Sequence, residues 1–137
     1  MIIFCNQLAD LLAPLLGMPV FSDLSGVQDA NHYALLTLET SSELHPGSRT
    51  FQLDLSLSVI HSAGDLTDNN LSDYAAVCST LDSAVLSLFS SFRKYSPLPG
   101  QPENSPLLLD WFNTPPELSA ENHSYAAETK ITLAAQF

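Results

Sequence analysis

The sequence predicts an α+β fold in the order α-β-β-α-β-β, with an antiparallel sheet of about four strands and helices packed on one face. Three observations predict this fold. Apolar and polar residues alternate along residues 50–64, which is typical of a half-buried strand because successive side chains leave opposite faces of a sheet. The period changes to 3.6 over residues 71–92, which indicates an amphipathic helix. Residues 124–137 alternate again, so we expect the helix to cover the apolar face of these strands.

Residues 3–16 carry leucines at helical spacing and are predicted to form the first helix. Pro14 should kink or shorten this helix, and Gly17 should end it. Residues 19–23 could add a short extended piece. The next strand is expected at residues 32–40, where apolar residues fall on both parities, as in a strand covered on both faces.

A polar turn around Pro46 and Gly47 joins this strand to the alternating stretch, so residues 32–61 are predicted to form a β-hairpin with a long connection. The polar face of its second strand carries Gln, Asp and Ser residues. This face could meet either water or a neighbouring subunit, and the residue types do not choose between them.

After the long helix, which Arg93 and Lys94 should stabilise at its end, the sequence becomes rich in proline. We expect residues 1–137 to form a single domain with a Pro-rich irregular excursion at 95–122. A short strand is predicted within it at 107–112. A long loop in a compact domain is often functional.

The composition excludes several classes of protein. Hydrophobic residues make up 45% and charged residues 14%, which fits neither a disordered chain nor a coiled coil. The net charge is −11 with four basic residues, so direct binding to nucleic acid or to an anionic membrane is not expected. Cys5 and Cys78 lie on apolar stripes of the predicted helices, where buried reduced thiols are expected. The N-terminus lacks the pattern of a signal peptide, so a cytoplasmic location is the default.

No catalytic or metal-binding motif is evident, and we expect neither an enzyme nor a cofactor. The histidines are spread out, without a pair at helical spacing beside a carboxylate; they are His32, His45, His61 and His123. Trp111 and Phe112 are the large aromatic residues in a loop-like context. They could pack the loop onto the domain, or they could anchor a partner, because aromatic residues dominate interface hot spots.

The order and spacing of these elements resemble the tail-terminator, or tail-completion, proteins of long-tailed bacteriophages. The segments that carry the resemblance are "LADLLAPLLGMPVFSD", "YALLTLET", "TFQLDLSLSVIH", "LSDYAAVCSTLDSAVLSLF" and "ETKITLAAQF". The resemblance implies a non-enzymatic phage or prophage subunit without a cofactor. It implies a homo-oligomeric ring, typically a hexamer, that stops tail-tube growth and joins the head connector. Such a protein is cytoplasmic during assembly and then part of the virion tail.

If this resemblance holds, the polar sheet face and the loops at 41–49 and 95–122 are the expected contact surfaces. The candidate interface residues are Trp111, Phe112, Arg49, Arg93 and Lys94. The alternative is a small acidic chaperone of the type III secretion class, which binds an unfolded partner. Chaperones of that class usually place three strands between the first two helices and finish on a helix, whereas this chain is predicted to finish on a strand.

Overall fold

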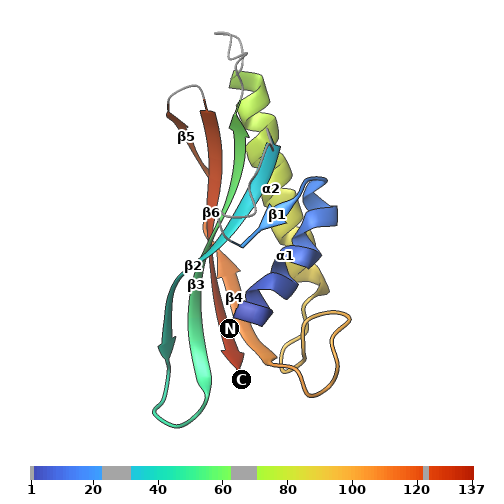
Figure 1. The fold of residues 1–137 in the computed structure, drawn as a ribbon, viewed down its shortest axis with the longest axis vertical. Coiled ribbons are helices and arrows are strands. Elements are labelled where there is room, and N and C mark those ends of the chain that lie inside the picture. Colours follow the sequence, from blue (N-terminus) through green and yellow to red (C-terminus); the bar gives the residue numbers. More distant parts are fainter. Residues whose placement is uncertain (1, 23–31, 63–70, 122–123) are drawn as a thin grey trace.

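The computed structural model describes residues 2–22, 32–62, 71–121 and 124–137 (Figure 1). The expected α+β class is confirmed. In chain order the elements are α1 (Ile2–Leu16), β1 (Val20–Phe21), β2 (His32–Glu43), β3 (Thr50–Ser62), α2 (Leu71–Ser91), β4 (Leu107–Asn113), β5 (Glu117–Glu121) and β6 (Ser124–Gln136).

The strands form a six-stranded sheet in the order β1-β2-β3-β6-β4, with β5 also paired to β6. All pairings are antiparallel except that of β1 with β2, which is parallel. Two strands are additional to the expected four. They are β1, which lies in the short segment that could adopt an extended conformation, and β5. The final strand and the hairpin form as predicted, and β2 reaches Glu43, beyond the expected residue 40.

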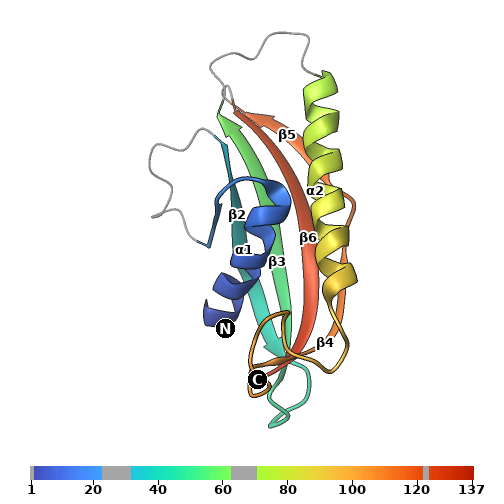
Figure 2. The same cartoon turned by 90° about the vertical axis from the view of Figure 1, so that its right-hand side faces the viewer.

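Both helices lie on the same face of the sheet (Figures 1 and 2). α1 packs near β1 and β2, α2 packs near β6, and the two helices contact each other. The core between helices and sheet is apolar and includes Leu12 and Leu81 from the helices and Leu36, Leu57 and Leu133 from the strands. The apolar face of β3, which was predicted to lie under the long helix, is therefore covered by α2 together with α1.

The prediction that β2 is covered on both faces is wrong. Ala34 and Leu36 face the helices and are buried, whereas Leu35, of the other parity, is half-buried. In the described part of the chain, the face that carries Leu35 has no helix over it (Figure 1). Apolar residues on both parities here do not indicate a second layer.

Pro14 does not shorten α1, which continues to Leu16. Pro14 lies in the last turn of the helix, where it removes one intrahelical hydrogen bond without ending it. Gly17 ends the helix as expected, with a φ of +69° and an N–H that donates to Ala13 O at 2.9 Å. A residue with a Cβ would be strained at this φ.

The Pro-rich stretch is less irregular than expected. The short strand predicted at 107–112 is β4, and residues 117–121, expected to be irregular, form β5 along β6. Leu98 is buried in the core, and the backbone of Ser96 bonds to Leu108. Most of this stretch is therefore tied to the sheet by backbone pairing and by one buried leucine.

Candidate functional site

The uncovered face of the sheet is polar along its centre. On β3 and β6 the register places Ser56 opposite Lys130, Ser58 opposite Glu128 and Asp54 opposite Thr132. These residues have the parity opposite to that of the buried leucines. This surface, which we call the open face, is built by strands.

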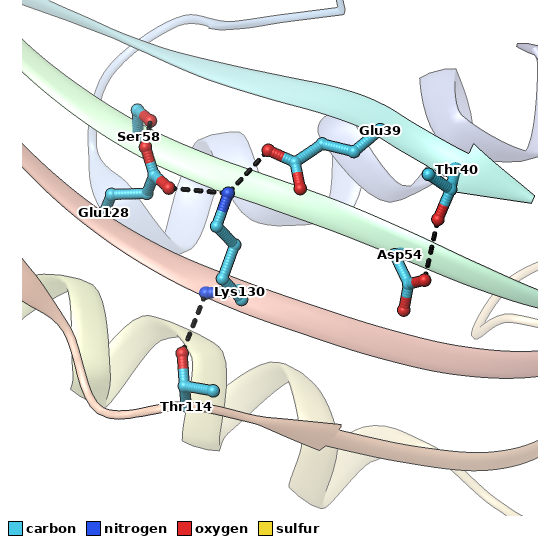
Figure 3. A network of polar contacts seen from close by, with 7 residues as sticks. All are labelled: Glu39, Thr40, Asp54, Ser58, Thr114, Glu128 and Lys130. Carbon is cyan, nitrogen blue, oxygen red and sulfur yellow. Dashed lines mark hydrogen bonds and ion pairs between the residues drawn. The ribbon is translucent and has the colours of Figure 1, made fainter.

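Lys130 is the cation at the centre of the open face (Figure 3). Its Nζ lies 2.8 Å from Glu128 Oε1 and 2.5 Å from Glu39 Oε1, so it joins β6 to β2 across β3. The hydrogen bond to Glu128 and then the one to Glu39 raise the pKa of Lys130 above its ordinary value. Because all three side chains are 40–46% exposed, this contact orients the side chains more than it stabilises the fold.

Asp54 organises a second set of hydrogen bonds on the open face. Its Oδ2 accepts from Thr40 Oγ1 at 2.7 Å, and its Oδ1 accepts from Thr132 Oγ1 at 3.2 Å. Gln52 Nε2 donates to the same Oδ1 at 3.4 Å. Neighbouring side chains therefore hold this carboxylate, and the open face presents a pre-ordered polar surface to whatever it meets.

Trp111 and Phe112 leave opposite faces of β4. The Trp111 ring is half-buried and packs against α2, with its centroid 5.3 Å from that of Phe92 and 6.3 Å from that of Phe89. Phe112 shares the parity of the open face and is 59% exposed. Of the two roles considered for these aromatic residues, packing onto the domain therefore applies to Trp111. Of the two, Phe112 is the one whose ring is exposed and available to anchor a partner.

The three candidate basic residues are exposed. Lys94 Nζ lies 3.6 Å from Asp110 Oδ1, two residues before Phe112 on β4. Arg93 precedes Lys94, just after the end of α2, so both lie beyond the last turn that they were expected to stabilise. Arg49 has a φ of +59° in the β2–β3 turn, where its carbonyl accepts from the N–H of Phe137. Arg93 and Lys94 therefore lie beside β4, whereas Arg49 lies in the hairpin turn.

Sequence reasoning did not find a hollow of about 220 Å³ on the opposite side of the sheet. It is lined by Ile2, Cys5, Ser22, Leu36 and Leu38. Ile2, which lines it, and the neighbouring Ile3 of α1 are more than 70% exposed. A signal was present, because two isoleucines outside the leucine stripe of an amphipathic helix are unusual on a solvent-facing surface.

The described residues include no group of three or more His, Cys, Asp and Glu side chains that could hold a metal ion. His45 is exposed in the hairpin turn, and His32 pairs in register with His61 at the strand ends. His123 lies outside the described residues.

Cys5 is buried as expected, Cys78 is half-buried, and burial raises the pKa of both thiols. Neither described helix is long and apolar enough to cross a membrane.

Neither a protein-family model nor a curated protein sequence matches the chain. Solved structures do match its fold. One is a chain of the virion of a native gene transfer agent particle, which matches with a TM-score of 0.51 and 13% sequence identity. The match covers 92% of this chain and 84% of that chain. At this identity the likeness establishes a shared fold.

Proposed function

We propose that the protein is a phage-related structural subunit that completes a tail. In this proposal, copies of the chain form a ring, typically a hexamer, at the end of the tail tube. The ring stops elongation of the tube and presents a face to the head connector. The observation that carries the proposal is the likeness to a virion chain over nearly the whole length of both proteins.

The surface chemistry supports an assembly role. The open face carries a fixed polar network around Lys130 and Asp54. Phe112 provides an apolar contact at the β4 edge of the open face, and the hollow beside α1 provides another on the helix side of the opposite sheet edge. Such a distribution suits the recognition of other proteins, because aromatic and aliphatic anchors within polar rims are typical of interfaces.

A chaperone for an unfolded partner is the second candidate, because β1 raises the number of strands between α1 and α2 to three, as expected for that class. The solution mass, measured by size-exclusion chromatography with light scattering, separates the two proposals. We expect a hexamer-sized species whose negative-stain images are rings. A tight dimer at every concentration would contradict the ring and favour the chaperone. A monomer would require the same measurement on protein bound to tail tubes.

A further inference from the structure

We propose that copies of this chain associate head-to-tail, with the β4 edge of one copy inserting Phe112 into the hollow beside α1 of the next. This inference rests on the proposed function, because it names the surfaces through which the ring would form. The occupant of the hollow is thus a second copy of the same chain.

The two surfaces lie at opposite edges of one sheet (Figure 2). The β4 edge presents Phe112 and Tyr95, which are 59% and 74% exposed. The α1 edge presents Ile2, Ile3 and the hollow that Leu38 lines. An exposed aromatic ring at one edge suits a hollow lined mainly by apolar side chains at the other, because aromatic anchors that enter such hollows are typical of interfaces.

The register places these surfaces at the same level of the sheet. Leu38 of β2 pairs with Leu55, Leu55 with Ile131, and Ile131 with Asn113, the neighbour of Phe112. A contact between two different surfaces is heterologous and generates a ring when the rotation closes, or a filament when it does not. The two surfaces lie at the same height along the strands, so neighbouring copies can make this contact with little shift along the ring axis. A small shift favours a closed ring over an open filament.

Charge is also complementary across this contact. Arg93 and Lys94, two of the four basic residues of the chain, flank the Phe112 edge. Asp10 follows Ile3 by two helical turns on the exposed side of α1. In a protein with a net charge of −11, copies repel at long range, so Arg93 and Lys94 at one edge and Asp10 at the other favour this orientation over others.

Site-specific photo-cross-linking tests the contact. The photoreactive amino acid p-benzoylphenylalanine replaces Phe112, and the protein is mixed in equal amounts of ¹⁵N-labelled and unlabelled chains, alone at high concentration and on tail tubes. We expect cross-linked peptides of mixed isotope content that join position 112 to residues 2–5 or 36–38. The same probe at Leu86, an exposed residue on α2, is the control and should not reach those residues.

Phe112→Asp should weaken self-association at least tenfold, whereas the matched change Leu86→Asp should leave it unaltered. Cross-links from position 112 to another surface of a neighbour, in a protein that still forms rings, would overturn this contact and leave the proposed function standing. The absence of mixed-isotope cross-links both in solution and on tubes, with tubes left uncapped, would overturn both proposals.

Discussion

At the scale of single residues, Trp111 and Phe112 are neighbours in sequence with different environments. Trp111 packs its ring on Phe89 and Phe92, whereas Phe112 lies exposed on the open face. Replacing Trp111 with Ala should lower the free energy of unfolding by about 2–4 kcal/mol, somewhat less than for a fully buried tryptophan. Phe112→Ala, the matched control, should cost less than about 1 kcal/mol. Urea denaturation of both variants measures this, and equal losses would contradict the assigned faces.

Lys130 makes a pH-dependent contribution to stability. Because hydrogen bonds to Glu128 and Glu39 raise its pKa in the folded state, the contribution is fully present below the unfolded value of 10.5 and is lost as the pH rises through the folded value. Lys130→Met should therefore destabilise the protein at neutral pH by less than about 1 kcal/mol, the range of exposed ion pairs.

The difference between Lys130→Met and the wild type should shrink toward zero in alkaline solution, where the lysine becomes neutral. Denaturation curves at neutral pH and above pH 10.5 measure this difference, and the comparison cancels other alkaline titrations shared by both proteins. A difference that grows with pH would contradict the assigned ion pairs.

At the scale of elements, α2 stabilises the fold through one face. Leu81 is fully buried on that face and Leu86 is 56% exposed on the same helix. Leu81→Ala should lower the free energy of unfolding by about 2–5 kcal/mol, because it leaves a cavity against the sheet. Leu86→Ala should change it by no more than about 0.5 kcal/mol. Similar losses in thermal or chemical denaturation would mean that α2 packs through a different face.

Periodicity was enough to predict the principal elements, because α1, α2, β2, β3, β4 and β6 each present a repeated apolar face to one core. It did not predict β5, whose sequence ELSAE alternates over only five residues and carries a single large apolar side chain. Backbone pairing with β6 orders that strand, and pairing partners leave no local signal in a sequence. The same limit applies to β1, a two-residue strand.

The candidate site was only partly predictable. The polar parity of β3 indicated the open face, but its central ion pair joins residues 91 positions apart, which only the register brings together. The irregularity of β4 between Leu108 and Asp110 decides which of Trp111 and Phe112 faces the helices. Such a bulge shifts the parity of the residues after it, so strand alternation alone does not assign their faces.

At the scale of the whole molecule, one layer of helices covers one face of the sheet and leaves the other face without a helix in the described part of the chain (Figure 1). The β4 edge exposes the aromatic rings of Phe112 and Tyr95, and the α1 edge exposes isoleucines beside a hollow, which gives a single chain two unlike surfaces. A subunit with two unlike, complementary surfaces suits a head-to-tail ring better than a two-fold dimer, which uses one surface twice.

Tail-tube capping tests the central claim most directly. Tail-tube protein of the same particle is polymerised with and without this protein, and tube lengths and ends are imaged by negative stain. We expect tubes that stop lengthening and that carry a ring at one end. The Phe112→Asp variant should lose this effect and the Leu86→Asp variant should keep it. Tubes of unchanged length with bare ends, in the presence of folded protein, would contradict a tail-completion role.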